Sequence, residues 1–185
     1  MTSRYLAPWR VDVDIRPEVE RPLPIRVARL VRVVALALDA AGAPSPAAIG
    51  LVLSNDAEVA ELNERHLGHE GATDVLSFPL LPPESFPAHA GDSPGPRPVI
   101  GSPAAFAGPP GRRVHLGDVV VSVERAVEQA HEGRGGQTGD VRWSPADELR
   151  LLVTHGALHV CGWDHADPAE EREMRALEQR LLATG

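Results

Sequence analysis

The segment from Ser144 to His165 constrains the fold of this chain more than any other, because it joins strong helix signals to regularly spaced histidines. Ser144 is a good N-cap residue, Pro145 suits the first helical position, and Asp147 follows three residues after the cap. The apolar stretch LRLLVTHGALHVC then runs up to Gly162, and glycine is common directly after a helix. The sequence therefore predicts a long helix that ends just before this glycine, where the chain changes direction.

His155 and His159 lie four residues apart on this predicted helix, so their side chains face the same way, with Cβ atoms about 5–6 Å apart. Both imidazoles could reach one ion with metal–nitrogen bonds of about 2.0–2.1 Å. His165 follows the glycine by three residues and could supply a third ligand from another direction. Three neutral imidazoles leave one position of a tetrahedral zinc ion open for water, as in catalytic sites. The pattern predicts one zinc ion per chain, although nickel, cobalt or copper also suit three imidazoles.

The alternative is that these are unrelated histidines, two on a helix surface and one in a loop. Histidine is not rare in this chain, which contains eight. The other five do not combine helical spacing with a following glycine: His66, His69, His89, His115 and His131. The spacing therefore favours the metal site.

The same spacing occurs in the zinc protease signature H-E-x-x-H-x-x-G-x-x-H, including its glycine. Gly156 stands where the proteases carry the glutamate that acts as a general base. Glycine cannot accept a proton from water. The ligand pattern of the signature is thus present without its proteolytic base.

The rest of the chain predicts a single α+β domain over residues 1–185. Alternating or continuous apolar residues predict strands at 10–16, 49–53, 74–80 and 115–123. Cap signals and apolar stripes predict helices at 22–41, 55–68 and 124–131 and a last helix from 167, besides the histidine helix. Without a regular βαβ repeat, we expect a small mixed four-stranded sheet packed by about five helices, one of them a metalloprotease-like metal helix.

Residues 82–113 hold nine of the 18 prolines and five glycines. This composition predicts a long surface loop without a regular element, inserted into the domain.

Composition limits what the protein can bind and where it acts. The longest apolar run, Val33–Leu38, is far shorter than the roughly 20 residues that span a bilayer. The N-terminus lacks the apolar core of a secretory signal, and the lone Cys161 cannot form an internal disulfide, which favours the cytoplasm.

Cys161 points away from His159 on a helix, so we expect a buried structural thiol. The net charge of −8 argues against non-specific coating of nucleic acid; a local basic patch or the metal would have to hold RNA.

Three motifs resemble those of the YbeY family of endoribonucleases. Residues 155–165, HGALHVCGWDH, match its H-G-x-L-H-x-x-G-x-D-H signature, which differs from the protease signature by a glycine in place of glutamate at the second position. Residues 73–79, TDVLSFP, look like its T-D-V-L-S-F-P strand, and residues 116–119, LGDV, look like its L-G-D-I strand. The similarity extends from the N-terminal strand to the last helix, with the proline-rich loop as an insertion.

The resemblance implies a metal-dependent hydrolase that cleaves single-stranded RNA with metal-activated water. It implies roles in maturing 16S ribosomal RNA of the small subunit and in ribosome quality control, with no DNA and no membrane partner. Residue by residue, it carries over the metal ligands His155, His159 and His165. No side chain is assigned as the general base.

Three residues near these motifs have open roles. Ser77 and Asp118, on the two family-like strands, are candidates for walls of the cleft or are ordinary strand residues. Asp164 either orients a histidine from behind or caps the turn before the last helix.

The chain departs from the family pattern before the T-D-V-L-S-F-P strand. Many members carry a tyrosine–arginine pair where this chain has His66 and Leu67. Arg65 is two residues away, which is a rotation of roughly 200° on a helix, so it would have to reach a phosphate from another angle. Arg112 and Arg113 are an alternative phosphate clamp, or the solvated end of the loop.

Two rival functions remain open. One is a metallohydrolase with another substrate, including a peptidase. The other is a non-catalytic ribosome-assembly factor in which the metal only holds the C-terminal helices together.

Overall fold

The computed structural model describes residues 1–68, 71, 73–88, 113–132, 143–165 and 167–184. In these residues one mixed sheet of five strands packs with five α-helices, so the predicted α+β class holds and the predicted number of four strands was wrong. The strands are β1 (Thr2–Leu6), β2 (Trp9–Ile15), β3 (Ala47–Ser54), β4 (Val75–Pro79) and β5 (Val114–Ser122). The helices are α1 (Val27–Ala40), α2 (Asp56–Leu67), α3 (Val123–Glu132), α4 (Pro145–Val160) and α5 (Pro168–Thr184).

The strand that sequence analysis missed is β1, which pairs antiparallel with β2 at one edge of the sheet. All of its residues are exposed. Because neither face of β1 is buried, its sequence TSRYL lacks the alternation that reveals a half-buried strand.

The strand order is β1-β2-β3-β5-β4. The strands β2, β3 and β5 are parallel, and β4 is antiparallel to β5 at the second edge. Pro79 ends this edge strand, as its sequence predicted, since proline cannot donate to a central ladder.

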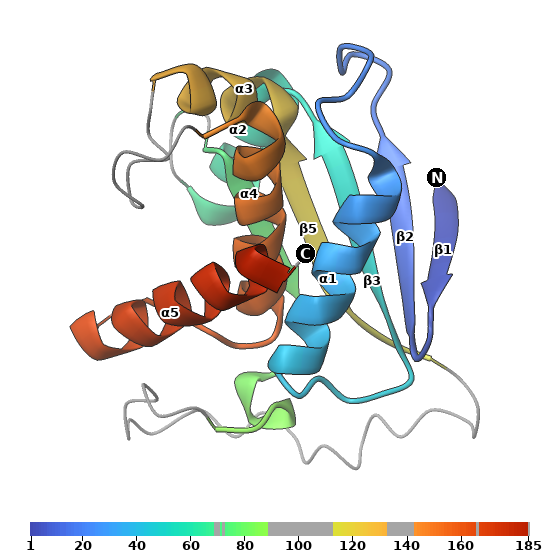
Figure 1. The fold of residues 1–185 in the computed structure, drawn as a ribbon, viewed down its shortest axis with the longest axis vertical. Helices are drawn as coiled ribbons and strands as arrows, with labels where there is room; N and C mark the ends of the chain where they lie inside the picture. Colours follow the sequence, from blue (N-terminus) through green and yellow to red (C-terminus); the bar gives the residue numbers. More distant parts are fainter. Residues whose placement is uncertain (69–70, 72, 89–112, 133–142, 166, 185) are drawn as a thin grey trace.

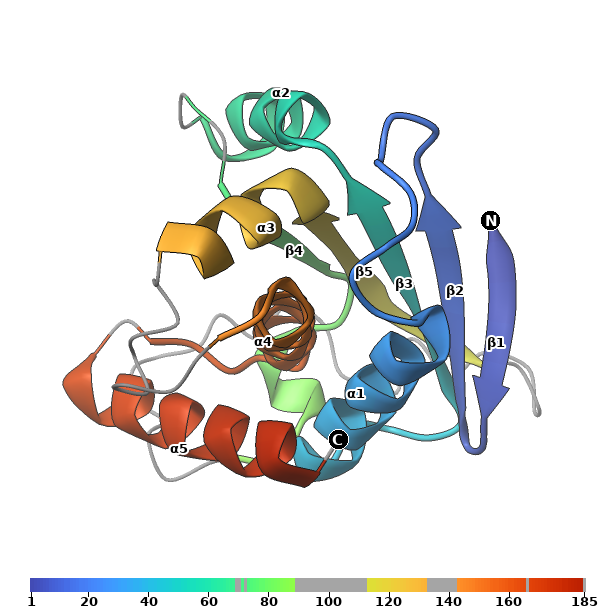
Figure 2. The same ribbon diagram turned by 45° about the horizontal axis from the view of Figure 1, so that its top comes forward.

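Helices cover the two faces of the sheet unequally. The main core lies between the sheet and helices α1 and α4, and Figure 1 shows these two helices side by side in front of the strands. Helices α3 and α5 flank α4 (Figure 2). On the opposite face, α2 covers a small cluster made by Val59, Leu76 and Val120. No helix in the described part of the chain combines the length and the apolar character needed to cross a membrane.

The ends of the helices follow the cap signals of the sequence. The Ser144 side chain accepts the backbone N–H of Asp147, whose own side chain accepts the backbone N–H of Ser144, which completes a capping box on α4. Asn55 caps α2 with one hydrogen bond, in which its side chain accepts the backbone N–H of Glu58. The first helix begins at Val27 and not at residue 22, because the prolines at 22 and 24 disfavour helical backbone before them.

The proline-rich loop begins with a regular element that sequence analysis did not predict. Pro83–Ser85 form one turn of 3-10 helix, and Phe86, only 8% exposed, packs into the main core. The prediction of a wholly irregular loop was therefore wrong at its start. Residues 89–112 lie outside the described residues, so the insertion itself stays a prediction.

A β-bulge interrupts the pairing of β5 with β3. Ala48 and Gly50 are separated by one residue, whereas their partners His115 and Asp118 are separated by two. Gly117 lies in the extra step with a φ of +150°, a conformation that side chains disfavour. Because the bulge shifts the alternation by one residue, His115 and Asp118 point to the same face, where their side chains lie 3.0 Å apart.

Candidate metal centre

The three histidines of the signature come together at the end of α4. His155 and His159 lie one turn apart on this helix, and His165 lies in the connection to α5. One nitrogen from each ring can be chosen so that all three atoms lie within 4.8 Å of one another. The Nε2 atoms of His155 and His159 are 3.0 Å apart. Around a tetrahedral ion with typical zinc–nitrogen bonds, ligand nitrogens are about 3.3 Å apart, so small side-chain adjustments would let this cluster hold a metal ion.

The turn after α4 brings His165 back over the helix. Gly162 has a φ of +83°, and the backbone N–H of Trp163 bonds the carbonyl of Leu158, which closes the helix end. The carboxylate of Asp164 accepts the backbone N–H of His165 at 2.8 Å. The structure thus gives Asp164 a local role in holding the backbone of a candidate ligand.

Burial keeps the central imidazole neutral. Burial is the largest cause, and together with the neighbouring rings of His155 and His165 it lowers the pKa of His159 to about 4. A neutral imidazole has a free lone pair at pH 7 and can bind a cation without first losing a proton.

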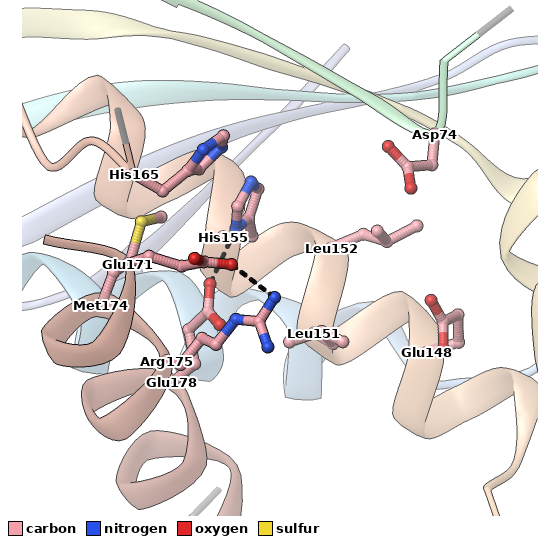
Figure 3. Close-up of a pocket in the computed structure, with 10 residues that line it drawn as sticks. All are labelled: Asp74, Glu148, Leu151, Leu152, His155, His165, Glu171, Met174, Arg175 and Glu178. Atoms are coloured by element: carbon pink, nitrogen blue, oxygen red, sulfur yellow. Dashed lines mark hydrogen bonds and ion pairs between the residues drawn. The ribbon is translucent and has the colours of Figure 1, made fainter. Parts of the chain in front are cut away.

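A buried carboxylate that sequence analysis missed lies behind His155. Glu178 of α5 is 5% exposed, and its Oε1 atom is 2.7 Å from Nδ1 of His155 (Figure 3). The sequence carried a signal for it, because Glu178 shares the buried stripe of α5 with Met174 and Leu177. An acidic residue on an apolar helix face is seldom buried without a partner.

Gly156 allows α4 to approach the sheet closely. A Cβ atom at this position would lie 2.5 Å from Cγ1 of Val119 and 3.0 Å from Cγ2 of Val75. Ser77 of β4 donates its hydroxyl to the Gly156 carbonyl at 3.1 Å. The glutamate of the protease signature would therefore have no room here, since position 156 faces the strands.

Two hollows meet at the histidines. The first, which we call the α5 hollow, has a volume of about 220 Å³ and is lined by His155, His165 and residues of α4 and α5, with Asp74 opposite (Figure 3). The second, the β4 hollow, has a volume of about 540 Å³ and lies between β4 and the turn after α4. All three histidines line the β4 hollow, and Ser77 and Asp164 line it with them.

Comparison with known proteins identifies the family. The family model described as Endoribonuclease YbeY matches residues 22–184 of this chain. The chain belongs to the endoribonuclease YbeY family. This membership confirms the resemblance found in the sequence, and with it the prediction of an enzyme from an endoribonuclease family.

Individual YbeY relatives are similar over most of the chain. A Salinispora tropica protein named Endoribonuclease YbeY is 40% identical over 148 residues, which are 80% of this chain and 80% of that protein. One from Thermobifida fusca with the same name is 36% identical and covers 89% of this chain and 88% of its own length. One from Prochlorococcus marinus is 33% identical over 72% of this chain, which spans 57% of that longer protein. The solution structure of a Thermotoga maritima protein aligns with a TM-score of 0.48 at 19% identity, over 93% of this chain and 86% of that one.

The two YbeY-like strands contribute differently to the centre. Ser77 faces α4 and lines the β4 hollow. Asp118 pairs with His115 on the sheet face that α4 does not cover, because the adjacent Val119 points to Gly156. The structure therefore brings Ser77 to the histidines and does not bring Asp118 there.

The departure from the YbeY pattern falls at the end of α2, on the face away from α4. Arg65 is exposed and forms an ion pair with Glu61 of the same helix. The side chain of Leu67 lies outside the described residues. Arg65 lines neither of the two hollows at the histidines.

Of the two arginines at the end of the long loop, the structure describes Arg113, which lies apart from the centre. Arg113 donates to the backbone carbonyl of Pro8 and lies over the ring of Tyr5, next to the β1–β2 hairpin. Arg112 lies outside the described residues. A different arginine, Arg175 of α5, lines the α5 hollow and pairs with Glu171 at 2.6 Å; sequence analysis did not single it out, because it is one of several arginines on an amphipathic helix.

Cys161 is buried, as the sequence predicted, and burial raises the pKa of its thiol to about 12. A protonated thiol is a poor metal ligand.

Proposed function

We propose that this chain is a metal-dependent endoribonuclease that cleaves single-stranded RNA, with precursors of small-subunit ribosomal RNA as its substrates. The proposal extends to a role in 16S ribosomal RNA maturation and ribosome quality control in the cytoplasm. The observation that carries it is the convergence of three imidazoles where two hollows meet, in a chain of the YbeY family.

The donor set fits one divalent transition metal ion. His155, His159 and His165 would hold it, and Glu178 bonds one of them from behind. Zinc is the proposed ion, since imidazoles suit it and three of them leave a coordination position open. When bound, such an ion acidifies water and polarises a phosphoryl oxygen, which is the chemistry that phosphodiester hydrolysis requires.

The histidine cluster is open to solvent on one side, where a nucleic acid strand could reach it. His165 is exposed at the rim, whereas His155 and His159 are half-buried, so one side of the cluster faces solvent. The β4 hollow, which all three histidines and Ser77 line, gives an extended chain room beside the cluster. Single-stranded RNA can follow such a path, while a duplex is stiffer and wider. This supports the preference for single strands.

Peptide hydrolysis by the zinc-protease route is disfavoured by the site itself. Position 156 carries no carboxylate and faces Val119 and Val75 of the sheet. The general base of the RNA reaction is left to the metal-activated water or to an oxygen of the substrate.

The direct test measures metal content and cleavage on the same preparation. We expect elemental analysis to find about one metal ion per chain, and cleavage of single-stranded segments in a 16S ribosomal RNA precursor that stops with chelator and resumes when metal is restored. Duplex RNA and casein serve as control substrates and should stay intact. Casein cleavage without RNA cleavage would favour a peptidase. Loss of melting temperature on chelation, with no RNA cleavage at any metal content, would favour a structural metal in an assembly factor.

A further inference from the structure

We propose that Glu178 is a positioning residue for the metal centre: it fixes the ring of His155 through Nδ1 so that Nε2 faces the cluster, and it thereby couples metal binding to the docking of α5. The inference rests on the proposed metal site but concerns a residue outside the ligand set.

The hydrogen bond determines which nitrogen of His155 is available. Oε1 of Glu178 is 2.7 Å from Nδ1, while Nε2 of the same ring is 3.0 Å from Nε2 of His159. A carboxylate accepts hydrogen bonds and does not donate them, so Nδ1 must carry the proton. The lone pair of Nε2 is then free on the side of the ring where His159 lies. This is the orientation in which His155 can act as a ligand.

The burial of Glu178 makes this contact difficult to replace. The residue is 5% exposed and sits on the face of α5 that also buries Met174 and Leu177. A carboxylate taken out of water is costly unless it is hydrogen-bonded. With solvent largely excluded, the bond to His155 is also stronger than it would be at the surface. A helix needs no charge at this position for packing, so the acid is better explained by its partner than by the core.

The contact joins α4 to α5, and a second hydrogen bond between these helices runs from the Arg150 side chain to the backbone carbonyl of Leu182. His155 belongs to α4 and Glu178 to α5, and His165 lies in the segment that connects them. If α5 moves away, His155 loses the acceptor that orients it. Binding of a metal ion should therefore stabilise the docked α5, and the docked α5 should tighten metal binding by the same factor.

The test compares two substitutions of Glu178 with a matched control. Glu178→Leu removes the acceptor and puts an apolar side chain of similar size in its place. Replacing a buried charge in this way often leaves stability unchanged. Glu178→Gln keeps an oxygen that can accept from Nδ1. Glu171→Gln removes the same charge from the same hollow, on the same helix, without touching a histidine.

We expect zinc affinity, measured by competition with a chromogenic chelator, to fall about 10- to 100-fold in Glu178→Leu, as for other partners of ligating histidines. Glu178→Gln should recover most of this loss, and Glu171→Gln should bind like the wild type. The visible spectrum of the cobalt-loaded protein should change in Glu178→Leu only. A purely structural role would lower the unfolding free energy of the metal-free protein and leave metal affinity within about twofold, which would overturn the proposal.

A second measurement needs no variant. In the zinc-loaded wild type, nitrogen-15 NMR of the imidazoles should identify Nδ1 of His155 as protonated and Nε2 as the metal-bound atom. The reverse assignment would refute the proposal even if Glu178→Leu fails to fold. If the wild type itself binds no zinc, the proposed function fails; if it binds zinc and the Glu178 variants bind equally well, only this inference fails.

Discussion

The two faces of the sheet differ in how they hold their polar residues. On the α4 face, the half-buried His155 and His159 and the buried Glu178 lie beside the main core, and the hydrogen bond from His155 to Glu178 orients the histidine ring. On the α2 face, a small apolar cluster is surrounded by partly exposed pairs such as His115 with Asp118 and Arg16 with Glu58. Both faces contain a histidine–carboxylate pair, but only the α4 face has the burial that fixes its geometry. The residue types of a histidine–carboxylate pair do not show whether it belongs to a candidate metal centre or to the surface. The burial of the pair in the fold does.

The largest expected effect compares one histidine from each face. His159→Ala should lower zinc affinity by more than about 100-fold, because it removes a ligand outright while loss of a ligand's partner alone costs 10- to 100-fold. RNA cleavage should be lost with it. His115→Ala, on the α2 face, should keep both metal content and cleavage. Cleavage of RNA by a metal-free His159→Ala protein would refute hydrolysis by metal-activated water.

A second comparison uses one glycine from each face. An added methyl group at Gly156 would meet Cγ1 of the buried Val119 at 2.5 Å, whereas one at Gly50 would meet Oδ1 of the half-exposed Asp118 at 2.0 Å. The carboxylate can rotate into solvent and the valine cannot. We therefore expect Gly156→Ala to lower the unfolding free energy by about 1–3 kcal/mol, as overpacked cores do, and Gly50→Ala to lower it less. Denaturant unfolding of the wild type and the two variants measures these changes in unfolding free energy. An equal loss at both positions would show that the two faces are equally rigid.

A third prediction concerns acid sensitivity on the α2 face. The hydrogen bond from Arg16 holds the pKa of Glu58 below its usual value of 4.5, against the effect of burial, and the Ser54 hydroxyl lowers it further. The stability from this pair is therefore fully present above pH 4.5 and is lost as pH falls through the lowered pKa of the folded state. In denaturant unfolding from neutral pH downwards, Glu58→Gln should be less stable than the wild type at neutral pH. The difference should shrink in acid; a constant difference at all pH values would argue that the carboxylate charge is not involved.

The smallest effect is expected at Arg65. Its ion pair with Glu61 is exposed and spans one helical turn, a geometry worth about 0.3–0.5 kcal/mol. Arg65→Ala should change the unfolding free energy by no more than this and leave RNA cleavage within about twofold. A large loss of cleavage would show that the α2 end takes part in substrate binding after all.

The sequence was informative wherever a short segment carries its own signal. The cap of α4 at Ser144, the glycine that ends it and the spacing of its histidines are all local, and each is present in the structure. The edge position of β4 was likewise encoded in Pro79. These features depend on neighbours in the chain and not on the fold.

The features that could not be predicted depend on contacts between distant segments. The bond between His155 and Glu178 joins residues 23 positions apart, and only the crossing of α4 and α5 brings them together. The sequence left open whether Asp118 is a cleft wall or an ordinary strand residue, because the bulge at Gly117, which changes the alternation of faces along β5, has no sequence signature beyond one glycine. The strand β1 was missed because exposure on both faces removes the pattern that identifies strands.

Whether the three histidines bind one metal ion can be seen in an anomalous diffraction map of zinc-loaded crystals, collected at the zinc edge. We expect one peak within about 2.0–2.1 Å of a nitrogen of each of His155, His159 and His165. A zinc peak that lies elsewhere, with these three rings unliganded in a preparation that cleaves RNA, would contradict it.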